Sequence, residues 1–281
     1  MPDTSSPLAP LLGRTLVLAP HPDDEAVGCG TLMQRMRQPI VAFLTDGAPQ
    51  SRYFWARHGT RRAYADFRRR ESESALALIG IERSLSCEGV TDQELFHNLE
   101  HAQRWLDAAI ENARPEALLA TAFEGGHPDH DACSLLACIA GRRHALPVWE
   151  FPLYHRSVDG VVVNQQFREV NGSEIVIEPV AAEWDKKLRM FSEYGSQREV
   201  LQHFLAATER FRPLAEYDYT APPHPGVLNY EAWQWGITGG ELAAAFSAHL
   251  SSVGMSSENM SSANMSSANN EASVAGPERK R

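Results

Sequence analysis

The stretch LVLAPHPDDEAVGCG, residues 16–30, joins an apolar run to a cluster of polar side chains and decides how the fold is interpreted. Four apolar residues lead into a proline, and a histidine and three carboxylates then fall within five positions: His21, Asp23, Asp24 and Glu25. A short apolar run that ends in turn residues is typical of a buried strand in a parallel sheet. The stretch therefore predicts a strand, a tight turn rich in acidic groups, and a helix that begins near Glu25.

Short apolar runs and longer segments of helical period alternate along the first half of the chain. Strands are predicted at residues 15–20, 39–46, 83–87, 117–123 and 147–151. Helices are predicted at residues 25–37, 60–80, 92–112 and 129–144, the third with Thr91 or Asp92 as its cap. This alternation predicts a Rossmann-like, doubly wound α/β fold, with a mostly parallel sheet and helices on both faces.

The pattern changes after residue 155. Residues 158–170 and 173–180 alternate apolar and polar side chains with turn residues between them, which predicts an antiparallel pair of strands as a small addition to the sheet. Helices are expected at 181–193 and 196–210. The following segment, 211–238, is rich in Pro, Tyr and Trp and is either a cover over the core or an irregular packed edge. Residues 1–250 are expected to form a single domain, and the repetitive, polar residues 251–281 are expected to be a disordered tail.

Composition narrows the setting and the partners of the protein. The formal net charge of −10 disfavours binding to nucleic acid. The sequence contains neither a basic leader followed by an apolar stretch nor a run of about eighteen apolar residues, so we expect no membrane span and a cytoplasmic location. The cysteines are expected to be reduced, buried thiols; they are Cys29, Cys87, Cys133 and Cys138.

A second polar cluster, GGHPDHDA at residues 125–132, follows another predicted strand. Because the carboxyl ends of parallel strands lie at one edge of a sheet, the two clusters can converge there. Two imidazoles and one carboxylate on a divalent ion leave a position open for water, as a hydrolytic site requires. The same ligand types also serve ferrous oxygenases, so they do not distinguish Zn²⁺ from Fe²⁺. A single HPDD turn is more typical of an aspartate-capped helix, but the pair of clusters favours a metal site.

These motifs, in this order, resemble the PIG-L/LmbE-like family of zinc-dependent deacetylases, which act on N-acetylglucosamine units. The resemblance extends to FLTDGA at 43–48, to the helix that contains Arg68, Glu71 and Ala75, and to KLRMFSEYGSQ at 187–197. It covers about residues 14–200. What it implies is a Zn²⁺ enzyme that removes the N-acetyl group from an amino sugar or its conjugate.

The resemblance also implies a role for each motif residue. The implied metal ligands are His21, Asp24 and His130. Asp23 is implied as the general base. His127 is implied as the general acid or the group that stabilises the oxyanion, and Asp129 as the group that orients a histidine.

Substrate contacts are expected from Arg68, Tyr154 and Tyr194. One branch of the family carries a tyrosine where this chain has Gly125, and Tyr154 is a candidate to replace it. The other arginines of residues 57–70 are expected to form a solvated helix face. Trp233 and Trp235 are expected either to stack on a sugar ring or to pack in the core.

The expected function is therefore hydrolysis of an N-acetylated amino sugar. A metal-dependent esterase acting on O-acetyl sugars and a catalytically silent sugar-binding domain are the alternatives. Asp23 and His127 argue against the silent domain, because binding a sugar requires neither. The sequence does not indicate which glycoside is the substrate or what the oligomeric state is.

Overall fold

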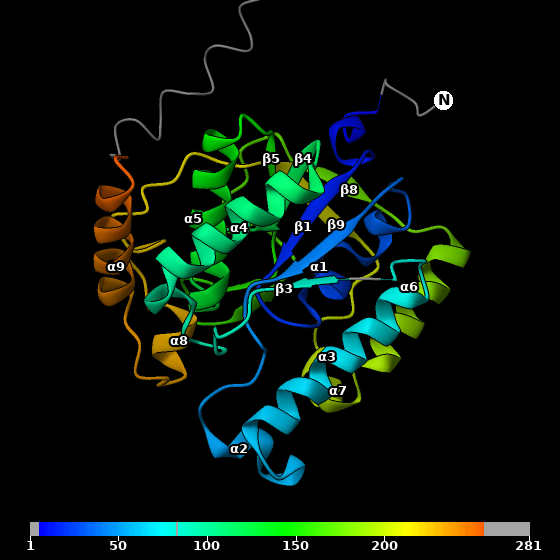
Figure 1. Cartoon of the computed structure of the whole chain (residues 1–281), viewed down its shortest axis with the longest axis horizontal. Coiled ribbons are helices and arrows are strands. Elements are labelled where there is room, and N and C mark those ends of the chain that lie inside the picture. Colours follow the sequence, from blue (N-terminus) through cyan, green and yellow to red (C-terminus); the bar gives the residue numbers. More distant parts are fainter. Residues whose placement is uncertain (1–5, 83, 256–281) are drawn as a thin grey trace, which may run out of the picture.

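A seven-stranded sheet lies between two layers of helices (Figure 1). The computed structural model describes residues 6–82 and 84–255. The strands are β1 (Thr15–Ala19), β2 (Ile40–Phe43), β3 (Ser84–Ser86), β4 (Ala117–Thr121), β5 (Val148–Phe151), β6 (Tyr154–Arg156), β7 (Val162–Asn164), β8 (Ile175–Ile177) and β9 (Glu209–Pro213). The α-helices are α1 (Asp24–Met33), α2 (Arg52–Trp55), α3 (Arg61–Ala77), α4 (Leu99–Ala113), α5 (Pro128–Arg143), α6 (Ala181–Glu193), α7 (Arg198–Leu201), α8 (Asn229–Ala232) and α9 (Gly239–Ser252). Short 3₁₀ turns are η1 (Ala9–Leu11), η2 (Ala56–His58), η3 (Leu95–His97) and η4 (Gly195–Gln197).

The sheet order explains why two distant motifs meet. The strands run β3-β2-β1-β4-β5-β9-β8, and the first five are parallel. From β1 the chain moves outward through β2 and β3, and it then returns to place β4 on the other side of β1. The neighbours β1 and β4 therefore form the switch point of a doubly wound sheet, where the loops that follow the two strands diverge. This confirms the predicted α/β class.

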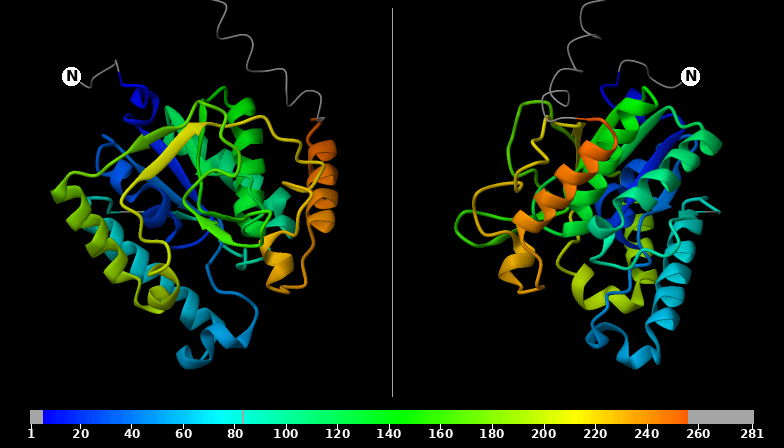
Figure 2. Two further views of the ribbon diagram at one scale, coloured as in Figure 1. Left: turned by 180° about the vertical axis from the view of Figure 1, so that it is seen from behind. Right: turned by 60° about the vertical axis from the view of Figure 1, so that its left-hand side comes forward.

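Side chains of β1 alternate between the two faces of the sheet. Leu16 and Leu18 belong to the core under α4, α5 and α9, whereas Val17 and Ala19 belong to the core under α1, α3 and α6. Every residue of the strand is buried. Figure 2 shows α3 beside α6 on one side of the sheet, and α9 next to α5 on the other. The continuous apolar run is thus explained by burial on both faces.

Four predicted helices of the doubly wound core are present, with one substantial shift. The segment predicted at 92–112 becomes helical only from Leu99, as α4. The prediction that Thr91 or Asp92 caps this helix is wrong, because the chain around Asp92 pairs with Pro49 in a β-bridge and η3 comes before the helix.

The region after β5 differs from the prediction in its pairing. β7 pairs with β6 in a hairpin, and β8 pairs antiparallel with β9 at the sheet edge, so the two predicted partner segments do not pair with each other. Helix α6 occupies the predicted residues. The helix predicted at 196–210 is wrong beyond α7, since Glu209 begins β9.

A buried ion pair explains the start of β9. The Nζ of Lys187 lies 2.6 Å from Oε1 of Glu209. The same carboxylate accepts hydrogen bonds from the amides of Thr31 and Leu32, just after Cys29 interrupts the helical geometry of α1 with φ −145°. Because an unpaired buried charge is costly, Glu209 is held at this position in β9.

Residues 211–238 pack partly in the core and partly line a cavity. Tyr219, Leu228 and Tyr230 are buried in the core beside α5, whereas Trp233 and Trp235 line a cavity. Helix α9 continues to Ser252, two residues into the predicted tail. The rest of the tail, residues 256–281, lies outside the described residues.

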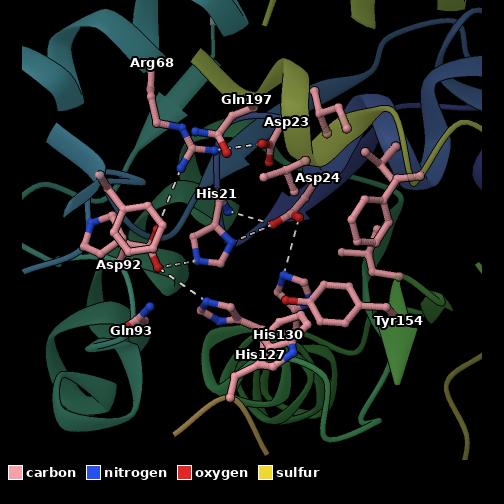
Figure 3. Close-up of a pocket in the computed structure, with 18 of the residues that line it drawn as sticks. His21, Asp23, Asp24, Arg68, Asp92, Gln93, His127, His130, Tyr154 and Gln197 are labelled. Atoms are coloured by element: carbon pink, nitrogen blue, oxygen red, sulfur yellow. Dashed lines mark hydrogen bonds and ion pairs between the residues drawn. The ribbon is translucent and has the colours of Figure 1, made fainter. Parts of the chain in front are cut away.

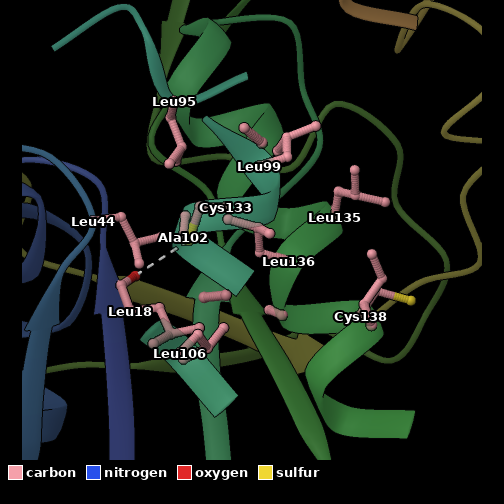
Figure 4. Close-up of a cluster of buried hydrophobic side chains, with 14 of the residues drawn as sticks. Leu18, Leu44, Leu95, Leu99, Ala102, Leu106, Cys133, Leu135, Leu136 and Cys138 are labelled. Carbon is pink, nitrogen blue, oxygen red and sulfur yellow. Dashed lines mark hydrogen bonds between the residues drawn. The ribbon is translucent and has the colours of Figure 1, made fainter. Parts of the chain in front are cut away.

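The predictions for the thiols are confirmed: all four cysteines are buried and unpaired by disulfides. Figure 4 shows Cys133 and Cys138 in the apolar cluster between the sheet and α4, α5. Within the residues that the structure describes, none of the helices is long and apolar enough to cross a membrane.

Candidate metal and catalytic site

The loops after β1 and β4 meet at a cavity of about 350 Å³ (Figure 3). Both sequence motifs contribute to its lining, through His21, Asp23 and Asp24 from the first and His127 and His130 from the second. The cavity lies at the carboxyl edge of the sheet, where doubly wound proteins bind ligands. The convergence expected from the sequence is therefore present.

Asp24 lies between two imidazoles. Its Oδ2 is 3.1 Å from Nδ1 of His21, and its Oδ1 is 3.4 Å from Nε2 of His130. Burial opposes ionisation of the Asp24 carboxyl, but the neighbouring His130 and His21 hold its pKa well below the usual range. The ionised carboxylate of Asp24 thus contacts one nitrogen of each of the two imidazoles.

A second carboxylate, that of Asp129, fixes the His21 ring through its other nitrogen, Nε2. Nε2 of His21 lies 3.0 Å from Oδ2 of Asp129. Asp129 is fully buried and also accepts hydrogen bonds from the amides of Gln93 and Leu95, at 2.6 and 3.0 Å. A carboxylate that binds one imidazole nitrogen leaves the other free to face a metal, and it fixes the direction of the ring.

His127 is oriented by the backbone of its own helix. As the N-cap of α5, its Nδ1 accepts a hydrogen bond of 3.1 Å from the amide of Asp129. A neutral ring that accepts at Nδ1 carries its proton on Nε2. Burial, and then the nearby His21, lower the pKa of His127, which favours this neutral form. Its Nε2 is 3.4 Å from Oδ1 of Asp92, at the cavity.

Asp23 adopts a strained backbone conformation. Its φ is +134°, a region that side-chain-bearing residues rarely enter. Oε2 of Glu25 accepts a hydrogen bond of 3.0 Å from the Asp23 amide, and Arg68 donates one of 2.8 Å to Oδ2 of Asp23. Burial raises the pKa of Asp23 to about 7, against the opposing effect of Arg68.

The residues present fit a divalent cation. Three buried imidazoles lie close enough to bind one ion, namely His21, His127 and His130, and a second such group combines His21 and His127 with Asp92 and Asp129. Although burial lowers the pKa of His21, the Asp92 and Asp24 carboxylates raise it well above its ordinary value. A site that draws a proton onto a buried imidazole in this way also attracts a metal cation, and the mixture of nitrogen and carboxylate donors suits several transition metals.

Comparison with known proteins shows which family this site resembles. The family model for PIG-L, GlcNAc-PI de-N-acetylase, matches residues 16–140 and so includes both motifs. The chain is 28% identical over 224 residues to 2'-N-acetylparomamine deacetylase of Streptomyces fradiae, covering 68% of this chain and 78% of that protein. It is 26% identical over 202 residues to the probable N-acetyl-alpha-D-glucosaminyl L-malate deacetylase 2 of Bacillus cereus, covering 67% and 85%. Over residues 16–140 the chain is thus similar to the PIG-L family.

Solved structures agree with the fold. A deacetylase from the teicoplanin biosynthesis pathway superposes with a TM-score of 0.58 at 19% identity, covering 73% of this chain and 99% of that one.

Other segments that carry the PIG-L resemblance meet around Arg68. Its guanidinium donates to the carbonyl of Gly47, within FLTDGA, and to the carbonyl of Pro22, in the first motif. Arg68 is buried and lines the cavity. The remaining arginines predicted to be solvated are exposed or half-buried, and Arg61 and Arg69 pair with carboxylates on the surface.

The two tyrosines expected to bind substrate lie in different places. Tyr154 lines the cavity, and its ring centroid is 5.4 Å from that of His130. Tyr194 is fully buried, lies outside the cavity lining, and donates its hydroxyl hydrogen bond to Glu25. Its position does not support the expected substrate contact. A side chain at Gly125, where the tyrosine of one PIG-L branch would stand, would meet Leu228, because an added Cβ lies 2.6 Å from Leu228 Cδ2.

Asp92 belongs to the site, although the sequence indicated only a helix cap. Its carboxylate lies 3.3 Å from Nε2 of His21, 3.4 Å from Nε2 of His127 and 3.7 Å from Arg68. It follows β3, a third parallel strand, at the same edge of the sheet. The sequence signal that could have identified Asp92 is its position shortly after the strand predicted at 83–87.

Proposed function

We propose that this protein hydrolyses the N-acetyl group of an N-acetylglucosamine-type sugar, releasing acetate and a free amine. The observation that carries the proposal is the contact of Asp24 with both His21 and His130 at a cavity that Asp23 and His127 also line. Similarity to the PIG-L family supports the reaction class, and the relatives' names mention N-acetylated amino sugars.

In this proposal His21, Asp24 and His130 hold a divalent ion, Zn²⁺ or Fe²⁺. When bound there, such an ion supplies Lewis-acid activation of water and of the amide carbonyl. Asp129 keeps His21 in the ligating orientation through its hydrogen bond to Nε2. Asp24, ionised between the two histidines, supplies the negative charge that binds the cation.

Asp23 carries the proton and His127 stabilises charge. Asp23, anchored by Arg68, takes a proton from the attacking water as general base and then gives it to the departing amine nitrogen. His127 carries its proton on Nε2, because its Nδ1 accepts from the backbone, and it donates a hydrogen bond from Nε2 to the oxyanion that develops from the amide carbonyl. The proton taken from water thus ends on the amine, and both side chains return to their starting forms. In this proposal Arg68, Asp92 and Tyr154 contact the sugar.

Paired measurements of acetate and primary amine test the proposal. Purified protein is loaded with Zn²⁺ and incubated with N-acetylglucosamine glycosides and, separately, with O-acetylated sugars. Equal amounts of acetate and amine from the N-acetyl substrates support the deacetylase. Acetate from the O-acetyl sugars alone indicates an esterase, and no acetate from either, with sugar binding retained, indicates a silent binding domain.

A further inference from the structure

One side of the active-site cavity is apolar, and apart from Tyr154 the proposed reaction does not use its residues. The polar side contains Asp23, Arg68 and Asp92, which the mechanism uses. The opposite side, here called the apolar wall, comprises Phe54, Tyr154, Val200, Phe204, Trp233 and Trp235. These residues come from α2, β6, α7 and the segments that follow α7 and α8, so separate parts of the chain build one surface.

The apolar wall is continuous with the reacting groups. Ring centroids are 5.0 Å apart between His127 and Trp235, and 5.3 Å apart between Trp235 and Trp233. A second row runs from His130 to Tyr154 at 5.4 Å and on to Phe204 at 5.3 Å. Figure 3 shows Tyr154 beside His130 at the cavity. A ligand whose acetamide lies at the histidines therefore extends along aromatic side chains.

The outer part of the wall exposes apolar surface to solvent. Phe54 is 41% exposed, Val200 50% and Trp233 44%. Single exposed apolar residues are ordinary on protein surfaces, but here three of them, from three separate elements, line one cavity. Covering this patch with an apolar ligand group removes it from water, which favours binding.

The charges of the cavity disfavour an anionic group at this place. Arg68 is the one cationic side chain of Lys or Arg type among the described lining residues. Its guanidinium is already bound to Gly47, Pro22 and Asp23. A phosphate at the wall would therefore find no Lys or Arg side chain free to pair with it among the described lining residues. The wall also offers few polar side chains to satisfy the hydroxyls of a second, buried sugar.

We propose that the apolar wall is a subsite for an uncharged apolar aglycone, so that the preferred substrate is an N-acetylated amino sugar linked to an aromatic or alkyl group. This inference rests on the proposed deacetylase function and specifies its substrate class. The sugar lies against the polar side with its acetamide at the histidines, and the aglycone lies along Trp233, Phe204 and Val200 toward the mouth.

The first experiment compares four aglycones on the Zn²⁺-loaded protein. Acetate release is measured for the phenyl, n-octyl and methyl glycosides of N-acetylglucosamine, each as both anomers, and for N-acetylglucosamine 1-phosphate. The proposal expects kcat/KM for the phenyl or the octyl glycoside to exceed that for the methyl glycoside by about tenfold or more, and the phosphate to be the poorest substrate. A phenyl preference assigns the wall to an aromatic group, and an octyl preference to an alkyl chain. Equal values for all the glycosides, or preference for the phosphate, overturn the proposal.

Binding separates failure of this proposal from failure of the proposed function. Dissociation constants for the same ligands are measured by calorimetry. If no ligand releases acetate yet the phenyl or octyl glycoside binds about tenfold tighter than the methyl glycoside, the reaction is wrong and the apolar subsite stands. If acetate is released without any preference in rate or binding, the reaction stands and the subsite is wrong.

Variants at the mouth test which residues form the subsite. Val200→Asn and Trp233→Ser change exposed side chains, so the fold is expected to tolerate them. Combined, they should bring the ratio of kcat/KM for the apolar over the methyl glycoside close to one. The matched control is Val158→Asn, at a fully exposed valine outside the cavity lining, which should keep the wild-type ratio. An unchanged ratio in the double variant overturns the assignment.

Discussion

The triplet His-Pro-Asp occurs at residues 21–23 and again at 127–129, and the backbone differs between the two copies. In the second copy the helix begins at the proline, with His127 as its N-cap in an ordinary extended conformation. In the first copy the helix begins only at Asp24, and Asp23 before it has φ +134°. One aspartate therefore enters the first turn of a regular helix, and the other lies in a strained turn at the cavity.

The two aspartates differ in what they contact as a result. Asp129 has no exposed surface, and its carboxylate binds two backbone amides and a ring nitrogen of His21. Asp23 lines the cavity, held by Glu25 from one side and Arg68 from the other. A backbone of this kind costs on the order of 1–3 kcal/mol and persists where surrounding contacts impose it. The same three residues thus give an orienting group in one copy and a reactive group in the other.

Replacing the strained aspartate should have the largest effect. Asp23→Asn keeps the shape of the side chain but cannot accept a proton, so we expect the rate to fall by roughly 10²–10⁴. Bound metal should stay near the wild-type amount, because the three expected ligands are untouched. Elemental analysis of metal beside kcat on one N-acetyl substrate checks this. Wild-type activity in Asp23→Asn would remove Asp23 from the mechanism.

Replacing the aspartate of the second copy, Asp129, by asparagine should weaken metal binding. Asp129→Asn replaces one acceptor oxygen by a donor nitrogen, so the amides of Gln93 and Leu95 or the His21 ring lose a partner. We expect metal affinity to fall by about 10–100-fold, with activity restored in part by excess metal. Titration of the metal-free protein with Zn²⁺ measures the affinity. If Asp129→Asn instead lost rate at full metal occupancy, the distinction between the two copies would fail.

The sequence predicted the convergence of the two copies because of one topological rule. Residues 16–30 and 117–132 each read as a strand followed by a polar turn, and parallel strands end at one edge. Neither the left-handed backbone of Asp23 nor the position of Asp92 has such a periodic signal. Asp92 lies between the three-residue strand β3 and η3, where tertiary contacts determine the path of the chain.

The edge of the sheet was harder to predict for a similar reason. Residues 196–210 have polar and apolar side chains at helical spacing, but Glu209 pairs with Lys187 and binds the amides of α1. These contacts of Glu209 with residues distant in the sequence favour strand β9 over the predicted helix. The role of Tyr194 was also misjudged: its place in a family-like segment suggested substrate contact, whereas its hydroxyl lies on Glu25, away from the cavity lining.

The smallest effects are expected from two replacements of Glu25, the residue that receives the Tyr194 hydroxyl. Glu25 is fully buried, accepts from the Asp23 amide and receives the hydroxyl of Tyr194. Burial raises the pKa of Glu25 to about 8, so at pH 7 its side chain is mostly neutral. Glutamine has the same shape and is neutral. Its carbonyl oxygen can accept from Asp23, and its amide group can donate to the Tyr194 oxygen.

We therefore expect Glu25→Gln at pH 7 to keep both the free energy of unfolding and kcat close to the wild-type values. Glu25→Ala leaves the Asp23 amide and the Tyr194 hydroxyl without their partner, which should lower the free energy of unfolding by about 1–3 kcal/mol. It should also lower kcat at unchanged metal content, because the turn at Asp23 loses a contact that holds it. Urea unfolding, kcat and metal analysis on both variants check this. Equal damage in the two variants would mean that Glu25 acts as a charged group, and a harmless alanine would mean that Arg68 and the surrounding backbone hold Asp23 without it.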